Sequence, residues 1–161
     1  MKSQTIGCKE RSVIRHASTL LRQFNVMYKD KGVRETALNG RILSYLQSTM
    51  TTIVSNVNIP SPELFGETFR PEFYIGSKRL CGVECKRLTE HSAKTRWKEG
   101  ISQALLYSTI YKHVFLVLMD FTKKRIYYNA FADLNSAESI FATKLLKSCS
   151  IEIISLNTHT N

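Results

Sequence analysis

The sequence predicts a mixed α/β domain with a central β-sheet flanked by helices. Apolar residues recur at three- and four-residue steps over residues 12–28 and 33–54, which is the period of amphipathic helices. Residues 114–119 are apolar at every position, as is typical of a central strand covered on both faces. Residues 73–75 and 80–86 predict two strands of a hairpin. We therefore expect strands in the middle of the domain and helices outside.

The remaining elements follow in chain order. The charged segment 29–32 ends in a glycine and predicts the turn between the first two helices. A short strand is expected at 56–59, and a turn at 76–79 joins the two hairpin strands. A helix over 97–112 precedes 114–119, so a right-handed parallel crossover is the favoured connection. The rest of the chain predicts a strand at 125–130, a helix at 136–148 and a strand at 151–156.

Composition limits the class of protein. The 161 residues include 23 Lys and Arg against 13 Asp and Glu, giving a formal net charge of +10. A hydrophobic content of 43% excludes a disordered tail, and the length predicts a single domain spanning residues 1–161. Four cysteines are too few for a disulfide framework, and no apolar run is long enough to span a bilayer. We expect a soluble, intracellular, cytoplasmic protein (in the host cytoplasm if viral) with a polyanionic partner and no membrane partner.

The segment from Glu72 to Lys86 carries the chemistry. Strand side chains alternate between faces, so Glu84 and Lys86 project to one side and Val83 and Cys85 to the other. Val83 and Cys85 are expected in the core, and the two charged residues at an exposed edge or cleft, with Glu72 brought nearby by the hairpin. Two converging carboxylates need a compensating cation, and Mg²⁺ favours oxygen ligands. A lysine beside such an ion suits phosphodiester hydrolysis.

These residues resemble the PD-(D/E)XK nuclease superfamily. Pro71-Glu72 stands where that superfamily has Pro-Asp, and Glu84-Cys85-Lys86 stands where it has (D/E)-x-K. Many members, Holliday-junction resolvases among them, add a glutamate from the first core helix, and Glu35 is similar to it. The helix after the lysine commonly carries Gln and then Tyr, and here it carries Gln103 and Tyr107.

The resemblance implies a restriction-endonuclease-like αβββαβ core over about residues 31–120. The N-terminal helix and a C-terminal strand-helix-strand extension lie outside it. The implied activity is a Mg²⁺-dependent deoxyribonuclease, an endonuclease that hydrolyses phosphodiester bonds, with Mn²⁺ as a substitute ion. Glu72, Glu84 and the Cys85 main-chain carbonyl would bind the metal, with Glu35 as a further ligand, while Lys86 assists the attacking water and Gln103 supports the site. One domain cuts one strand per site, so a homodimer is expected.

Basic residues follow the proposed site and predict phosphate contacts with DNA, with RNA not excluded. These residues are Arg87, Lys94, Arg96 and Lys98. Glu72 is one methylene longer than the usual aspartate, which keeps open a catalytically silent nucleic-acid-binding module of the same fold. A Holliday-junction resolvase and a restriction- or transposon-type endonuclease are further alternatives. Glu84 and Lys86 also fit a solvated edge strand, Glu35 fits a helix-dipole partner, and Asp120 is expected to form a turn.

Overall fold

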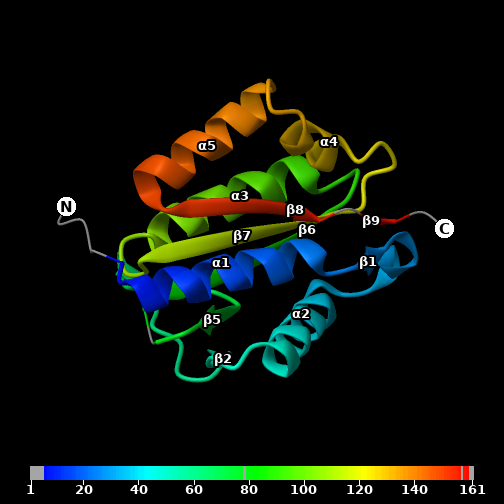
Figure 1. Cartoon of the computed structure of the whole chain (residues 1–161). Helices are drawn as coiled ribbons and strands as arrows, with labels where there is room; N and C mark the ends of the chain where they lie inside the picture. The colour runs from blue at the N-terminus through cyan, green and yellow to red at the C-terminus, as the bar shows by residue number, and fades with distance from the viewer. Residues whose placement is uncertain (1–5, 78, 157, 160–161) are drawn as a thin grey trace.

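A mixed five-stranded β-sheet lies at the centre of the protein, in the order β2-β5-β6-β7-β8 (Figure 1). The structure is a computed structural model that describes residues 6–77, 79–156 and 158–159. Strand pairs are antiparallel from β2 to β6 and parallel from β6 to β8. The strands are β2 (Val54–Ser55), β5 (Phe73–Ile75), β6 (Cys81–Leu88), β7 (His113–Asp120) and β8 (Ile151–Leu156). The predicted mixed sheet is confirmed, including the β5–β6 hairpin and the parallel β6–β7 pair.

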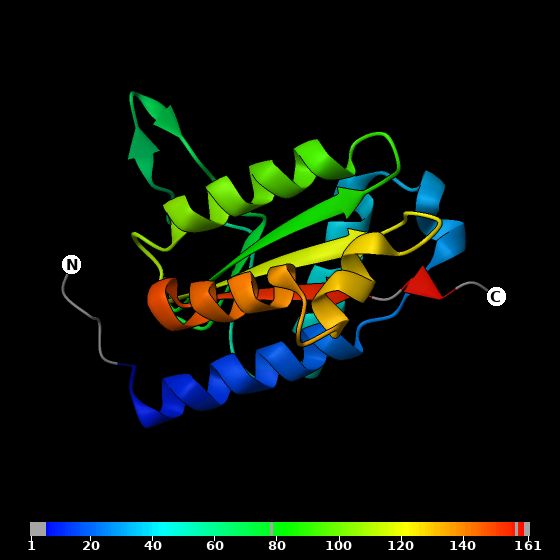
Figure 2. The same ribbon diagram turned by 90° about the horizontal axis from the view of Figure 1, so that it is seen from above.

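Helices cover both faces of this sheet (Figure 2). On one face lie α1 (Cys8–Gln23) and α2 (Glu35–Thr49), and on the other lie α3 (Ala93–Tyr107), α4 (Ile126–Ala132) and α5 (Ala137–Cys149). The smaller elements are β1 (Val26–Met27), the 3-10 helix η1 (Tyr28–Gly32), the hairpin β3 (Glu63–Leu64) with β4 (Glu67–Thr68), and β9 (Thr158–His159), which pairs with β1. Within the described residues, no helix is long and apolar enough to cross a membrane.

The alternation of side chains along β6 divides the core into two clusters. Val83 and Cys85 are fully buried and pack in the cluster beneath α1 and α2, as predicted. Leu88, in phase with Glu84 and Lys86, belongs to the cluster beneath α3 and α5. All eight residues of β7 are buried, which confirms the prediction of a central strand covered on both faces.

Several predicted boundaries differ from the structure. The first two helices end at Gln23 and Thr49, earlier than expected, and α3 spans Ala93–Tyr107 instead of 97–112. No strand forms at 56–59, where Asn58 has a left-handed backbone (φ 52°); the short strand β2 lies just before it. The predicted turn at 76–79 includes Lys78, which lies outside the described residues.

The prediction of a strand at 125–130 is wrong, because this segment forms α4. Asp120, at the end of β7, accounts for the difference. One oxygen of its carboxylate accepts the main-chain N–H groups of Tyr127 and Tyr128, both at 2.9 Å, and so caps the first turn of α4. The other oxygen accepts the Thr122 N–H at 3.0 Å and its hydroxyl at 2.7 Å, as expected of a turn-forming residue. The C-terminal extension is therefore helix-helix-strand.

Asp120→Ala is expected to lower the free energy of unfolding by about 2–4 kcal/mol, because it leaves buried donors without an acceptor. Asp133→Ala is the matched control, since the Asp133 carboxylate is exposed and accepts one N–H, that of Asn135 at 3.0 Å. The free energy of unfolding of the control should fall by less than about 1 kcal/mol. Urea denaturation followed by circular dichroism measures both, and equal losses would contradict the capping role of Asp120.

Candidate functional site

The centre of the candidate site is an ion pair buried beneath α3. Lys86 Nζ lies 2.6 Å from Glu84 Oε1, and the two residues are 4% and 2% exposed. The prediction that they share one face of β6 is confirmed. Of the two predicted surroundings, an exposed edge is wrong, because both residues are buried, whereas Lys86 does line a cleft. Strand alternation sets the direction of a side chain, and the helix packed above β6 determines whether water reaches it.

Gly100 brings α3 close to this pair. A Cβ atom at Gly100 would lie 3.0 Å from both Lys86 Cγ and Leu116 Cδ1, tighter than ordinary van der Waals contact. The absence of a side chain thus allows the helix to press on the stem of Lys86. Lys86 also lines a cleft of about 650 Å³ beside α3. The other residues of this cleft are Phe69, Thr95, Arg96, Lys98, Glu99, Ser102 and Gln103.

Glu72 lies beside this ion pair, immediately before β5. Its main-chain N–H donates to the Val83 carbonyl at 3.0 Å, which fixes it against the middle of β6. Burial raises the pKa of the Glu84 carboxyl to about 7; Lys86 lowers that pKa, and the charge of Glu72 raises it further. The hairpin therefore brings Glu72, Glu84 and Lys86 together as predicted.

The Cys85 main-chain carbonyl faces the edge of β6 that β5 does not cover. Successive carbonyls of a strand point to opposite neighbours. The Val83 carbonyl points toward β5, where it accepts the Glu72 N–H, and the Leu88 carbonyl points toward β7, where it accepts the Phe121 N–H at 2.9 Å. Cys85 is in phase with Val83, and β5 begins opposite Val83. Pro71, just before Glu72, has no N–H to offer this carbonyl.

Glu35, at the start of α2, closes this edge of β6. Its Oε2 accepts the Arg87 main-chain N–H at 2.7 Å, and its Oε1 pairs with the Arg96 guanidinium. Both oxygens of Glu35 are thus engaged with protein groups. Its charge still reaches the site, since it contributes with Glu84 and Glu72 to the raised pKa of Cys85, whose main cause is burial. The structure brings Glu35 near the site without presenting a free oxygen to it.

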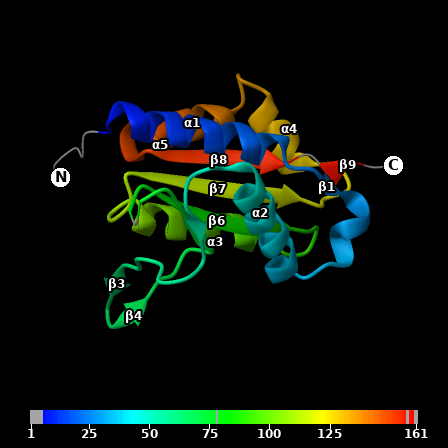
Figure 3. The same ribbon diagram turned by 60° about the horizontal axis from the view of Figure 1, so that its bottom comes forward.

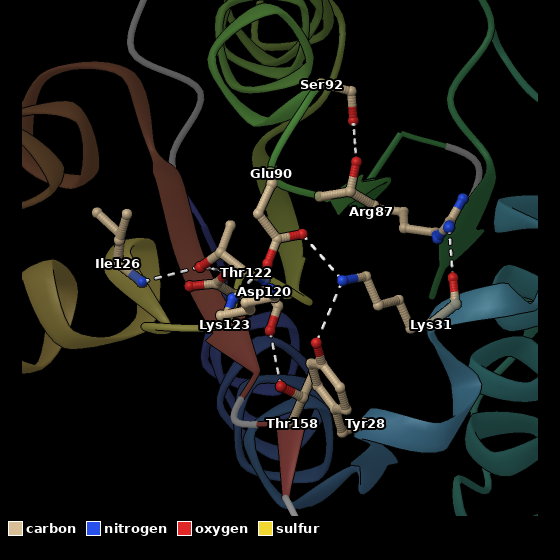
Figure 4. A network of polar contacts seen from close by, with 11 residues as sticks. Tyr28, Lys31, Arg87, Glu90, Ser92, Asp120, Thr122, Lys123, Ile126 and Thr158 are labelled. Carbon is tan, nitrogen blue, oxygen red and sulfur yellow. Dashed lines mark hydrogen bonds and ion pairs between the residues drawn. The ribbon is translucent and has the colours of Figure 1, made fainter.

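The four predicted phosphate-binding residues fall into two pairs. The Arg87 guanidinium donates to the Lys31 carbonyl (Figure 4). It also lies over the Phe121 ring, 6.0 Å from the ring centroid. Arg96 is paired with Glu35 and with Glu99, the latter at 2.8 Å. Within the described residues, Lys94 and Lys98 make no side-chain hydrogen bond or ion pair, and both are exposed. Lys98 lines the cleft with Arg96.

Buried polar atoms without partners surround the site. Glu84 Oε2, Gln103 Oε1 and Tyr107 Oη form no hydrogen bond of normal geometry among the described residues. The Tyr107 hydroxyl nevertheless lies close enough to Glu84 to lower the pKa of that carboxyl. Gln103 and Tyr107 lie on α3, as predicted, and burial together with the Glu84 charge raises the pKa of Tyr107. Sequence reasoning missed Asn39, a 5% exposed amide one helical turn after Glu35, whose two polar atoms are also unpartnered. A polar residue in the apolar stripe next to Leu38 and Ile42 was the available signal.

The donor set is compatible with Mg²⁺, although no complete protein cage is present. Within the described part of the chain, no three or more His, Cys, Asp or Glu side chains are grouped so as to hold a metal ion. Mg²⁺ usually takes only one or two carboxylates and keeps several waters. Glu84 Oε2 is buried without a hydrogen bond of normal geometry among the described residues, and Glu72 lies beside it. The Cys85 carbonyl faces the edge of β6 beyond the end of β5. Glu72 and Glu84 are therefore the residues that fit such an ion best.

Comparison with known proteins does not assign this arrangement to a family. No protein-family model, curated protein or solved structure matches the chain.

The Glu84 carboxyl predicts a pH dependence of stability. Its pKa is about 7 in the folded protein against 4.5 for the ordinary carboxyl. Between these values the folded state holds a proton that the unfolded state releases, so the free energy of unfolding falls as pH rises through this window. Between pH 5.5 and 8 this loss is about 2 kcal/mol.

The measurement is urea denaturation of wild type and Glu84→Gln at both pH values. The variant removes the titrating group, so its stability is expected to fall less than that of wild type over the same range. Parallel pH profiles for the two proteins would contradict a raised pKa at Glu84.

Proposed function

We propose that the chain is a Mg²⁺-dependent deoxyribonuclease, an endonuclease of the PD-(D/E)XK type. The observation that carries the proposal is the buried Glu84–Lys86 pair at 2.6 Å, with Glu72 beside it and Lys86 lining a cleft. Withdrawing two ions from water costs several kcal/mol per ion, and carboxyls with strongly perturbed pKa values are concentrated at functional sites.

The order of elements supports the same superfamily. The elements α2, β2, β5, β6, α3 and β7 follow the helix, three strands, helix, strand order of a restriction-endonuclease-like core, with the hairpin β3–β4 inserted between β2 and β5. This order is compatible with a core over about residues 31–120. In this interpretation α1, α4 and α5 are additions that cover the sheet, and β8 is an addition that extends it.

Each site residue has a proposed role. Glu72, Glu84 and the Cys85 carbonyl would hold Mg²⁺, which would supply a Lewis acid and a bound water of lowered pKa. Lys86 would donate from Nζ to the attacking water or to negative charge developing on phosphorus. Glu35 would hold Arg96 and the end of β6 in place, and Gln103 would orient groups in the cleft from α3. Since there is one such site per chain, cutting both strands of a duplex favours a homodimer.

A catalytically silent nucleic-acid-binding module is the second candidate. Three observations favour it: Glu84 is paired with Lys86, both oxygens of Glu35 are engaged, and no cluster of three ligand side chains is found among the described residues. In such a module the cleft and Lys98 would bind the phosphate backbone, and the buried pair would serve only the fold.

Cleavage assays with Mg²⁺ decide between the two candidates. Glu84→Gln and Lys86→Met are each expected to slow nicking of supercoiled plasmid by about 100-fold or more, because each removes a group that acts on the scissile phosphate. Lys144→Ala, at an exposed position of α5, is the control and should cut at the wild-type rate. The same panel includes linear duplex, single strand, four-way junction and RNA.

Two results would overturn the nuclease. One is equal cleavage by wild type, Glu84→Gln and Lys86→Met. The other is wild-type binding that persists in EDTA without cleavage in Mg²⁺ or Mn²⁺, which would establish the binding module.

The salt dependence of DNA binding tests which basic residues contact phosphate and which are held by other groups of the protein. Lys98→Ala is expected to weaken DNA binding and to reduce the slope of log affinity against log salt by about 0.9, the contribution of one phosphate contact. Arg87→Ala should lower the melting temperature and leave that slope unchanged, because its guanidinium binds the Lys31 carbonyl. Fluorescence anisotropy from about 50 to 200 mM salt measures both. A wild-type slope in Lys98→Ala would show that the cleft does not hold the backbone.

A further inference from the structure

We propose that the β3–β4 hairpin is a nucleobase-binding arm in which Phe65 stacks on an unpaired base of the strand held in the cleft. The inference rests on the proposed nucleic-acid function and specifies its substrate as a strand with at least one unstacked base. Figure 3 shows the hairpin projecting from the body of the protein, away from the central sheet.

Phe65 is presented to solvent by the geometry of the hairpin tip. Glu63 pairs with Thr68 and Leu64 with Glu67, so Phe65 and Gly66 form the two-residue connection. Both have positive φ angles, 53° for Phe65 and 79° for Gly66. Such a backbone is rare for a bulky residue. The Phe65 ring gains no packing in exchange, because the residue is 98% exposed, the most exposed of the large hydrophobic residues described.

The base of the hairpin is fixed to the body. The Phe69 N–H donates to the Pro62 carbonyl at 2.9 Å and closes the loop just below β3 and β4. The Tyr111 hydroxyl donates to the Pro60 carbonyl at 2.7 Å, and Arg70 donates to the Asn56 carbonyl at 2.6 Å. The Tyr111 bond joins the segment to the body, and the other two bonds close the segment on itself below the hairpin.

The hairpin is continuous with the cleft. Phe69 directly follows β4 and lines the cleft together with Lys86, Arg96 and Lys98. A strand whose phosphates meet Lys98 would therefore pass the base of the hairpin, with Phe65 further along the same side. The cleft would supply positive charge, and the hairpin would supply the stacking surface. Proteins that bind single-stranded nucleic acid combine these two features.

The charges of the hairpin favour a base over a phosphate as its contact. Residues 60–69 contain no Lys or Arg, while Glu63 and Glu67 are both exposed. These carboxylates repel the backbone, so the hairpin contributes little to phosphate binding. The face of an aromatic ring binds any base regardless of sequence. The partner that matches this tip is thus a base already free of its duplex neighbour.

The experiment compares single-stranded DNA containing 2-aminopurine with the matched fully paired duplex. Phe65→Ala is expected to weaken binding of the single strand by about 5- to 100-fold, the range for losing one aromatic stack, and to abolish the protein-induced change in 2-aminopurine fluorescence. Phe65→Tyr should retain both. Leu64→Ala, the neighbouring 46% exposed residue, is the control and should bind as wild type.

The outcomes separate this inference from the function on which it rests. Suppose that wild type binds single-stranded DNA and that Lys98→Ala weakens this binding. If Phe65→Ala then binds as tightly as wild type, Phe65 does not stack on a base, and the proposal that the cleft binds the backbone remains. If wild type binds no nucleic acid, both fail. If Phe65→Ala instead abolishes self-association in sedimentation experiments and leaves single-strand binding unchanged, the tip is a contact between copies of the chain and the inference is overturned. An unchanged salt slope in Phe65→Ala, with weakened binding, supports stacking.

Discussion

The buried ion pair between Glu84 and Lys86 is the interaction on which the packing around β6 depends. Two charges withdrawn from water each cost several kcal/mol, and their attraction offsets that cost only when the geometry is good. The 2.6 Å contact meets this requirement, and Gly100 lets α3 pack directly on Lys86. The compensation is incomplete, because burial raises the Glu84 pKa to about 7 although Lys86 and the Tyr107 hydroxyl both lower it. A purely structural pair would gain from a better compensated carboxylate, which supports the proposal that Glu84 is a binding group.

β6 is longer than β5, and among the described residues its far half has no partner strand on that side. β5 pairs with residues 81–83, whereas β6 continues to Leu88. The uncovered edge exposes main-chain groups that need partners. Glu35 takes the Arg87 N–H, and the Arg87 guanidinium takes the Lys31 carbonyl. Lys31 in turn bridges Glu90 at 2.9 Å and Tyr28 at 3.2 Å, as Figure 4 shows. Polar side chains from the start of α2 and from η1 thus replace the missing strand, while the Cys85 carbonyl faces the same edge.

Sequence periodicity predicted the structure correctly where the pattern of apolar side chains shows which faces of a strand are buried. The alternation that separates Val83 from Glu84, and the uninterrupted apolar run of β7, follow from geometry that holds in any sheet. The segment 125–130 was misjudged because Tyr127, Tyr128 and Ile126 have high strand propensity, while the cap that makes it helical comes from Asp120. The burial of Lys86 and the engagement of Glu35 depend on contacts between distant segments. No local pattern reports such contacts.

The net charge of +10 is not concentrated at the cleft. Ion pairs within the chain leave this total unchanged, because each cancels one positive and one negative charge; the basic residues in them are Arg22, Lys31, Arg41, Lys86, Arg96 and Lys112. Around the cleft, Arg87 is held by a carbonyl and Arg96 by Glu35 and Glu99, which leaves Lys98 as the exposed cation on its lining without an ion pair among the described residues. If the cleft binds nucleic acid as proposed, its affinity would depend on few phosphate contacts, each salt-sensitive. A site with so little electrostatic attraction would need a second source of binding energy, and the proposed stacking on Phe65 would supply it without adding charge.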